Sequence, residues 1–176
     1  QADIVWTTRD GERIVAGQTL CRIVANTRAM LTAERAALNF LQLLSATATV
    51  THGYVDAVKG TRATIVDTRK TIPGLRLAQK YAVTCGGGTN HRMGLYDMIM
   101  LKDNHIDFCG GIAKAIEKTN QYLAENKLQL QIEVETRSLE DVAEVLRCGN
   151  IHRIMLDNFS PEDAAKAVQL IDGRFE

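Results

Sequence analysis

The chain has 176 residues, and its 21 lysine and arginine residues balance 21 aspartate and glutamate residues. This length allows one sizeable core, so we expect one domain, or one domain with part of another. Charge neutrality argues against a nucleic-acid partner, which usually needs a basic excess. No apolar run approaches the roughly 20 residues that span a bilayer, so we expect no membrane partner either.

The four cysteines, Cys21, Cys85, Cys109 and Cys148, are scattered and form no CxxC pair. Scattered cysteines in a chain of this size are typical of a reduced, cytoplasmic protein, and they argue against a zinc site. No secretory signal pattern is present. Because the sequence starts with Gln1 rather than methionine, we expect a fragment of a longer protein.

The beginning of the chain indicates a small β-rich element. Gly11 and Gly17 stand at turn positions between short β-type runs, and another such run follows at residues 21–24. We therefore expect a pair of hairpin strands within residues 10–24. The pattern predicts a structural role for this element.

Residues 32–59 are predicted to form one or two helices, because apolar residues recur there at helical spacing among good helix formers. Gly53 is the expected interruption and Gly60 the expected stop. Glu34 and Arg35 are adjacent in the sequence, so they point to different sides of the helix and do not simply pair with each other. On pattern alone, Arg35 is a solvated surface residue.

After Gly60, strands and helices alternate four times. The apolar runs predict strands at 63–66, 98–101, 128–135 and 154–156. Helical spacing and the capping signals at Ser138, Ser160 and Pro161 predict helices at 73–84, 112–126 and 138–149, and from Ser160 onward. This alternation is typical of a parallel sheet or an α/β barrel.

Charged side chains follow every predicted strand. These residues are Asp67, Thr68, Arg69 and Lys70 after the first strand, Lys102, Asp103 and Asn104 after the second, Glu133, Glu135 and Arg137 around the end of the third, and Asp157 and Asn158 after the fourth. In a barrel, the carboxyl ends of parallel strands face the same mouth, so we expect these side chains to converge. Four such strand ends predict one shared active site.

The cations of this set suit an anionic substrate. Arg69 and Arg92 have guanidinium groups that bind carboxylates or phosphates bidentately, and His91 stands beside Arg92. Lys70 and Lys102 suit phosphate as compact charges. These residues predict a substrate that carries several negative charges.

The carboxylates of the set suit a hard cation. Glu135 and Asp157 are candidate ligands for Mg²⁺, which takes oxygen ligands and often bridges to phosphate. Of the two glutamates on the third strand, Glu135 is the preferred ligand because it lies nearer the strand end. The glycine triplet at residues 86–88 either lets backbone amides approach an anion or forms a mobile loop at a helix end.

Several long motifs resemble those of the quinolinate phosphoribosyltransferase family, also called nicotinate-nucleotide pyrophosphorylase. The matching segments are 34–39, 67–76, 79–83, 86–88, 90–92, 102–105, 132–135 and 156–159. The resemblance runs along nearly the whole chain. It implies an amino-terminal α/β sandwich followed by an incomplete α/β barrel, assembled as a dimer or higher oligomer.

For the acceptor substrate, the resemblance implies four residues that hold the two carboxylates and the ring of quinolinate: Arg69, His91, Arg92 and Lys102. It also implies that Arg35 reaches into the site of a neighbouring subunit, which replaces the surface role expected from pattern alone. The implied activity is phosphoribosyl transfer from phosphoribosyl pyrophosphate to quinolinate with loss of carbon dioxide, a step of NAD biosynthesis.

For the donor substrate, the resemblance implies that Thr68 and Lys70 lie where quinolinate and phosphoribosyl pyrophosphate meet. Glu135 and Asp157 would face the ribose and the magnesium-bound diphosphate, and Mg²⁺ is the implied cofactor. The residues expected to act in catalysis are Lys102, Lys70, Glu135 and Asp157.

The resemblance divides the chain into two parts, with residues 1–60 as a remnant of the sandwich domain and residues 61–176 as a partial catalytic barrel. We expect truncation at both ends, because most of the sandwich and the family's later phosphate-binding loops are missing. Three other interpretations stay open: a Schiff-base lyase that uses Lys102 as nucleophile, a non-catalytic quinolinate-binding fragment, and a related enzyme that acts on nicotinate.

Overall fold

The structure, a computed structural model, describes residues 2–176 and divides into two compact units. The first unit ends at His91 and the second runs Arg92–Glu176. The predicted boundary between residues 60 and 61 does not coincide with this division, because helix α2 (Arg76–Cys85) packs against helix α1 (Thr27–Ala57) within the first unit. In the part of the chain that the structure describes, no helix is both long and apolar enough to cross a bilayer.

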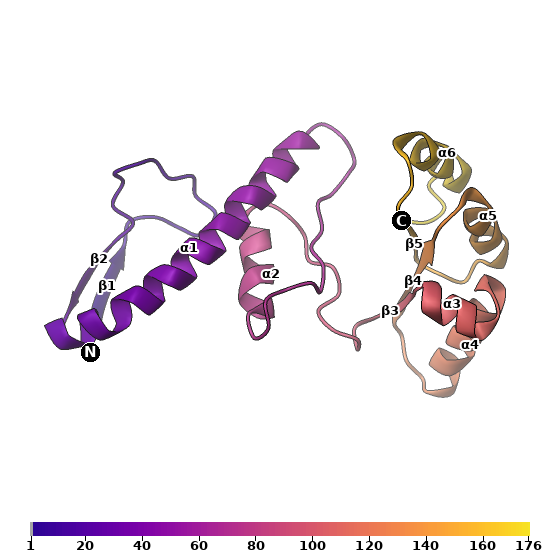
Figure 1. Ribbon diagram of the computed structural model, residues 1–176, viewed down its shortest axis with the longest axis horizontal. Coiled ribbons are helices and arrows are strands. Elements are labelled where there is room, and N and C mark those ends of the chain that lie inside the picture. The colour runs from indigo at the N-terminus through magenta and orange to yellow at the C-terminus, as the bar shows by residue number, and fades with distance from the viewer. Residues whose placement is uncertain (1) are drawn as a thin grey trace. The chain divides into compact units, whose positions relative to one another are not determined.

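A two-stranded antiparallel ribbon opens the first unit (Figure 1). Strand β1 (Ala2–Trp6) pairs with β2 (Cys21–Ala25), so that Ala2 lies opposite Ala25. An antiparallel strand pair is present, but only β2 overlaps the predicted residues 10–24. Strand β1 precedes them, and residues 7–20 form the connection. The β-type runs within the connection are too short and too rich in turn residues to form a strand.

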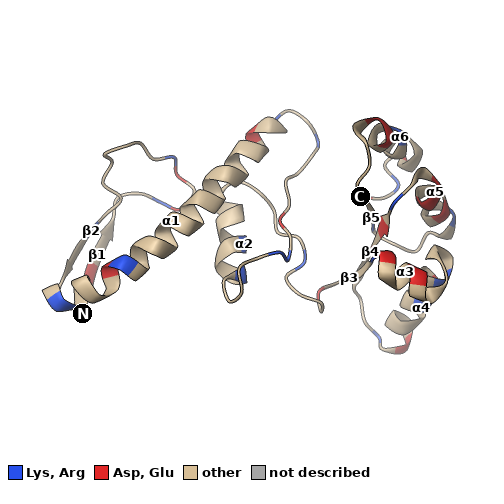
Figure 2. Ribbon diagram, viewed as in Figure 1, with Lys and Arg blue, Asp and Glu red and all other residues tan. Residues whose placement is uncertain are grey.

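Helix α1 is one continuous helix. The Asn26 side chain caps it by accepting hydrogen bonds from the backbone N–H groups of Arg28 and Ala29, at 3.0 and 3.4 Å. Gly53 does not interrupt it, because a single glycine inside a helix costs only about 1 kcal/mol. Residues 36–55 carry no lysine, arginine, aspartate or glutamate, which is the long tan stretch of α1 in Figure 2.

The glycine triplet is a packing contact between α1 and α2. A methyl group on Gly86 would lie 2.4 Å from the Ala48 carbonyl oxygen and 2.7 Å from Cβ of Thr51, both on α1. A methyl group on Gly88 would lie 2.9 Å from Cγ2 of the same Thr51. The two backbones approach this closely only because glycine has no side chain. Two of the three glycines therefore serve helix packing, a function that differs from both expected functions.

Replacing Gly86 by alanine is expected to lower the free energy of unfolding of the chain by about 1–3 kcal/mol, the usual effect of overpacking. The matched control is Gly53→Ala on α1, where an added methyl group meets nothing within 4 Å. That change should stabilise the helix by about 0.5–1 kcal/mol. Denaturant unfolding followed by circular dichroism measures both values, and equal effects at the two sites would contradict the packing contact.

The prediction of a sheet strand at residues 63–66 is wrong. The segment makes a single parallel bridge, between Val66 and Thr89, in which the Thr89 N–H donates to the Ile65 carbonyl oxygen at 2.8 Å. The Asp67 N–H donates to the Thr89 carbonyl oxygen at 3.1 Å. The pairing is limited to this bridge, because residues 61–64 form no strand-to-strand hydrogen bonds within the described chain. It still joins the segment that precedes Arg69 to the segment that precedes His91.

The second unit is a parallel α/β layer. Its sheet has the order β3 (Met98–Leu101), β4 (Gln131–Thr136) and β5 (Arg153–Leu156), with Leu101 opposite Val134 and Val134 opposite Ile154. Helices α3 (Asp103–Cys109), α4 (Ile112–Glu125), α5 (Leu139–Cys148) and α6 (Pro161–Ile171) lie on one side of this sheet (Figure 1). The predicted α/β class is confirmed, whereas α3 was not predicted.

The core of the second unit lies between this sheet and its helices. Ile132, Val134, Val142 and Val145 are at most 1% exposed. Because side chains alternate along a strand, Glu133 and Glu135 take the opposite face of β4 from Ile132 and Val134. The sheet therefore presents an apolar face to the helices and a charged face that is available for a site.

Candidate functional site

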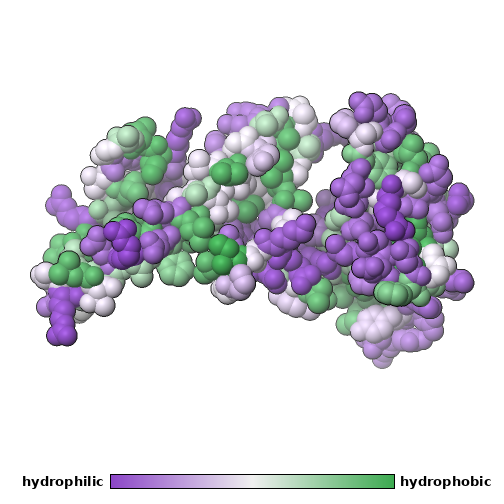
Figure 3. All heavy atoms as spheres, in the orientation of Figure 1, coloured by the Kyte–Doolittle hydropathy of each residue, from purple (hydrophilic) through white to green (hydrophobic). Residues whose placement is uncertain are grey.

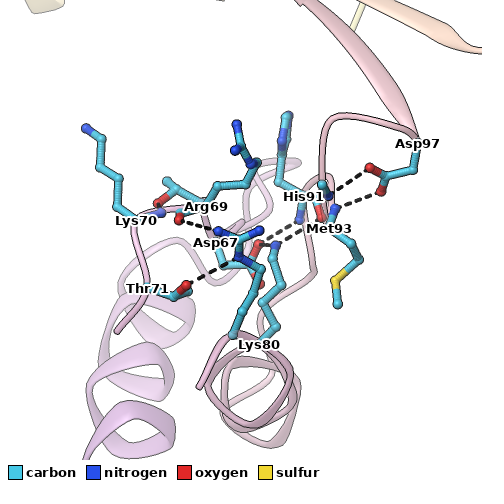
Figure 4. A network of polar contacts seen from close by, with 11 residues as sticks. Asp67, Arg69, Lys70, Thr71, Lys80, His91, Met93 and Asp97 are labelled. Carbon is cyan, nitrogen blue, oxygen red and sulfur yellow. Dashed lines mark hydrogen bonds and ion pairs between the residues drawn. The ribbon is translucent and has the colours of Figure 1, made fainter. Parts of the chain in front are cut away.

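In the first unit, cations gather on the loop after the bridge at Val66. The side chains of Arg69, Lys70 and His91 extend to the same side, away from the helix that carries Lys80 (Figure 4). The Thr68 hydroxyl accepts a hydrogen bond from the Lys70 N–H at 3.0 Å, which fixes the turn of the loop. The structure thus brings together three of the predicted anion-binding side chains.

Arg69 has an unusual feature among these residues. Its Nε atom is buried and has no hydrogen-bond partner within the described chain. A buried donor without a partner is destabilising by about 1–3 kcal/mol, so such atoms call for an explanation. A bound anion that accepts from this guanidinium would supply the missing partner.

Beneath these cations lies a buried ion pair that the sequence did not predict. The Lys80 ammonium on α2 forms an ion pair with Asp67, and their side chains are 1% and 7% exposed. Asp67 Oδ1 also accepts from the His91 N–H at 2.9 Å, and Lys80 Nζ donates to the His91 carbonyl oxygen at 3.1 Å (Figure 4). The backbone of His91 is therefore held at both its polar groups.

In the second unit, three predicted residues lie at the carboxyl ends of neighbouring parallel strands. Lys102 follows β3, Glu135 is near the end of β4, and Asp157 follows β5. Lys102 Nζ lies 3.4 Å from Glu135 Oε2. The Asp157 N–H donates to the Thr136 carbonyl oxygen at 3.0 Å. The carboxyl ends of these three strands lie side by side in the sheet.

Glu135 and Asp157 are also the predicted magnesium ligands. In residues 2–176, no three or more histidine, cysteine, aspartate or glutamate side chains gather closely enough to hold a metal ion. Mg²⁺ commonly uses only one or two carboxylates together with substrate phosphates and water. Two carboxylates on adjacent strand ends therefore have the donor chemistry that a magnesium–diphosphate group requires.

Arg92 is placed differently from the expectation of an open anion-binding side chain. It is 9% exposed, its Nη1 donates to the Met98 carbonyl oxygen at 3.3 Å and its Nη2 lies 3.5 Å from Met100 Sδ. Burial alone would raise the pKa of the nearby Asp97, but the N–H groups of Met93 and Gly94 and the charge of Arg92 hold that pKa below its usual value. Asp97 thereby fixes the loop that carries Arg92.

Glu133 is also buried, at 1% exposure, but it has a structural partner. Its Oε2 lies 3.5 Å from Nη1 of Arg153, whose Nη2 donates to Glu176 at 2.6 Å. Burial alone would lower the pKa of Arg153, but these two carboxylates more than offset it and raise that pKa. Glu133 is thus part of an ion-pair network with Arg153 and Glu176.

Arg35 lies on the exposed surface of α1. The four cysteines, Cys21, Cys85, Cys109 and Cys148, are free thiols. Sequence reasoning missed Asp67 as a structural anchor, together with Lys80 and Asp97. The available signal was the position of Asp67 in the strand-end cluster, but nothing in the sequence linked it to Lys80.

The fold and these clusters define a class. The second unit is a parallel α/β layer with a lysine and two carboxylates at its strand ends, and the first unit gathers an arginine, a lysine and a histidine. Both features are typical of enzymes that handle anionic substrates.

Family models and relatives make the class specific. The model "Quinolinate phosphoribosyl transferase, C-terminal domain" matches residues 47–176, and the corresponding N-terminal domain model matches residues 1–45. The chain is 46% identical to quinolinate phosphoribosyltransferase [decarboxylating] 1b of Nicotiana tabacum, over 97% of this chain and 52% of the relative. It is 44% identical to nicotinate-nucleotide pyrophosphorylase [carboxylating] of Mycobacterium leprae, over 97% of this chain and 58% of that relative.

A solved structure agrees. NadC from Streptococcus pyogenes superimposes with a TM-score of 0.91 at 44% sequence identity, covering 100% of this chain and 61% of that one. The chain belongs to the quinolinate phosphoribosyl transferase family. It spans about half the length of the curated relatives that it matches.

Proposed function

We propose that this chain carries residues of an enzyme that transfers a phosphoribosyl group from phosphoribosyl pyrophosphate to quinolinate, with products nicotinate mononucleotide, diphosphate and carbon dioxide. The observation that carries the proposal is the cluster of Arg69, Lys70 and His91, in which the buried Arg69 Nε lacks a partner within the described chain. Quinolinate is a dianion, and its carboxylates are suitable acceptors for guanidinium donors. The names of the relatives support the same activity.

In this proposal the acceptor is held by Arg69, His91, Arg92 and Lys102. The cations orient the pyridine nitrogen towards the anomeric carbon of the ribose, so that attack proceeds from a fixed position. Arg92 acts from a buried position at the start of β3, where it also supports the strand backbone. The cations further stabilise the negative charge of the substrate.

The donor is held by Thr68, Lys70, Glu135 and Asp157. The bond between the anomeric carbon and the diphosphate oxygen breaks, and the leaving diphosphate takes the electron pair, while carboxylates near the ribose stabilise the developing oxocarbenium charge. When bound to the diphosphate, Mg²⁺ would neutralise part of the leaving group's charge, with Glu135 and Asp157 as its protein ligands.

Decarboxylation follows ring alkylation. The bond between the ring and the 2-carboxylate breaks, and its electron pair remains on the ring carbon beside the cationic nitrogen, which stabilises it. That carbon then takes a proton. Lys102 and Arg69 assist electrostatically, and no covalent nucleophile is required.

The Schiff-base alternative is not favoured. Such a lysine needs an apolar pocket that lowers its pKa, whereas the side chain of Lys102 is 47% exposed and lies beside the Glu135 carboxylate. Failure of borohydride to trap a carbonyl substrate on this chain is the expected result.

We also propose that the chain assembles as a homodimer or higher oligomer in the cytoplasm, with Arg35 contributed across the interface. The first unit supports this, because α1 and the β1–β2 ribbon expose Trp6, Leu31 and Phe40 at 58%, 71% and 51%. Figure 3 shows hydrophobic side chains gathered over this unit. Large exposed apolar surfaces usually mark an interface. A monomeric mass in sedimentation at micromolar concentration would contradict the assembly.

Substrate choice tests the proposed function. We use a full-length chimera in which this chain replaces the matching segment of the Streptococcus pyogenes NadC, with that NadC as reference. The chimera should turn over quinolinate with a kcat/KM at least about 10²-fold above that for nicotinate, because nicotinate lacks one of the two carboxylates that the cationic residues would bind. A higher kcat/KM for nicotinate would favour the alternative of a related enzyme that acts on nicotinate, and equal turnover of both acids would contradict the predicted selectivity. Quinolinate binding without turnover would favour the non-catalytic alternative.

A further inference from the structure

The Asp67–Lys80 pair is the most deeply buried ion pair among the described residues of the first unit. A buried charge is destabilising unless it is paired and hydrogen-bonded. Asp67 and Lys80 are both paired and hydrogen-bonded. Besides contacting each other, they bind both backbone polar groups of His91. Neither side chain is exposed enough to touch a substrate directly.

Asn90 completes the arrangement. With its amide nitrogen turned towards the two available acceptors, it lies 2.6 Å from Asp67 Oδ2 and 2.9 Å from the Lys80 carbonyl oxygen. One carboxylate therefore receives hydrogen bonds from Lys80, Asn90 and His91, which come from α2 and from the segment after the bridge at Thr89. Asp67 itself begins the loop that carries Arg69 and Lys70.

This network connects two anion-binding segments that are far apart in the sequence. Arg69 lies two residues after Asp67. The backbone N–H and carbonyl groups of His91 are hydrogen-bonded to Asp67 and Lys80 (Figure 4). A shift of the ion pair would therefore move the backbone at Arg69 relative to the backbone at His91. Misplacement of a binding group by about 1 Å is enough to lower activity by about 10²-fold.

We propose that Asp67 and Lys80 are positioning residues for the acceptor substrate: they set the distance between Arg69 and His91, and they neutralise each other so that neither binds the substrate. This inference rests on the proposed function, because the proposed function identifies the acceptor as quinolinate. A purely structural pair would affect stability alone. A positioning pair changes acceptor binding even where stability is preserved.

The test is a charge-balance cycle in the full-length chimera, with Asp67→Asn, Lys80→Met and the double variant. Each single variant leaves one buried charge without its partner and should raise KM for quinolinate by about 10²-fold. The KM for phosphoribosyl pyrophosphate should change by less than about 3-fold, since the network holds the acceptor residues. Thermal unfolding is measured in parallel on every variant.

The double variant separates positioning from stability. Replacing both charges of a buried pair is often neutral for stability, so its unfolding midpoint should return towards that of the unsubstituted chimera. The asparagine that replaces Asp67 can still accept from the His91 N–H, but the Lys80 donor to the His91 carbonyl is lost. The KM for quinolinate should therefore stay raised by about 10-fold, the value of one lost hydrogen bond.

The control is Asp163→Asn with Lys166→Met, which removes an exposed ion pair of 2.7 Å on α6 and should change neither KM. A stable double variant with an unchanged KM for quinolinate would overturn the positioning role, as would equal effects on both substrates. If the unsubstituted chimera does not act on quinolinate while the reference NadC does, the proposed function fails instead.

Discussion

Replacement of Lys102 by alanine is expected to lower kcat of the full-length chimera by about 10²–10³-fold, the usual effect of removing one preorganised charge from a reacting centre. Lys102 stands at the carboxyl end of β3, with its ammonium 3.4 Å from Glu135. Among the described residues, it is the one lysine that directly follows a strand of the parallel sheet. Its removal deprives the reacting ring of positive charge and leaves Glu135 without this partner.

The fold should survive this change. The Lys102 side chain is about half exposed, and an ion pair in that setting contributes at most about 1 kcal/mol. Lys118→Ala, at an exposed position of α4, is the matched control and should leave kcat unchanged. Steady-state kinetics measure kcat of each variant, and circular dichroism shows whether its fold is retained. Near-normal turnover in Lys102→Ala would remove this residue from the catalytic assignment.

Arg69→Ala should raise KM for quinolinate by about 10²-fold or more, because hydrogen bonds to a charged group contribute about 1.5–3 kcal/mol each and a guanidinium offers two. Its Nε is buried, and the described residues supply it with no hydrogen-bond acceptor, so this donor is available to an acceptor such as a substrate carboxylate. Stability should change little or rise, because the unpaired donor is removed.

Arg69→Lys distinguishes geometry from charge. Lysine keeps the positive charge but loses the planar fork that binds a carboxylate bidentately, so it should recover only a small part of the loss. Isothermal titration with quinolinate measures both variants, and Lys127→Ala in the exposed segment after α4 is the control. Full recovery by lysine would mean that Arg69 acts as a simple charge.

The parallel sheet could be predicted well because its signals are local. Residues 98–101 were predicted as a strand and form β3, and the cap residues Ser138 and Ser160 accept hydrogen bonds from Asp141 and Asp163 at 3.1 Å. Caps and apolar runs act over a few residues, so the sequence alone reveals them. Strand order then follows from the preference for parallel neighbours.

The features that could not be predicted from the sequence depend on tertiary contacts. Residues 63–66 look like a strand, but their pairing depends on where Thr89 lies. The glycine triplet packs against α1, which no local pattern shows. Lys80 looks like an ordinary helix lysine, and its burial depends on a carboxylate from another segment.

The site was predicted in part for the same reason. Lys102 and Asp157 follow strands and Glu135 lies near the end of one, so the rule of strand ends singles these residues out from the sequence. Arg69, Lys70 and His91 share a side of the first unit because the Asp67 network holds their segments. That network is a long-range feature, and only the structure reveals it.

The central claim is that residues of this chain bind quinolinate and serve its decarboxylating phosphoribosylation. The most direct measurement uses quinolinate labelled at the 2-carboxylate, with phosphoribosyl pyrophosphate and the full-length chimera. The proposed function predicts one labelled carbon dioxide and one nicotinate mononucleotide per diphosphate released, and in Arg69→Ala all three should fall together by about 10²-fold at quinolinate concentrations below KM. Diphosphate release without labelled carbon dioxide, or unchanged product formation in Arg69→Ala at these concentrations, would contradict it.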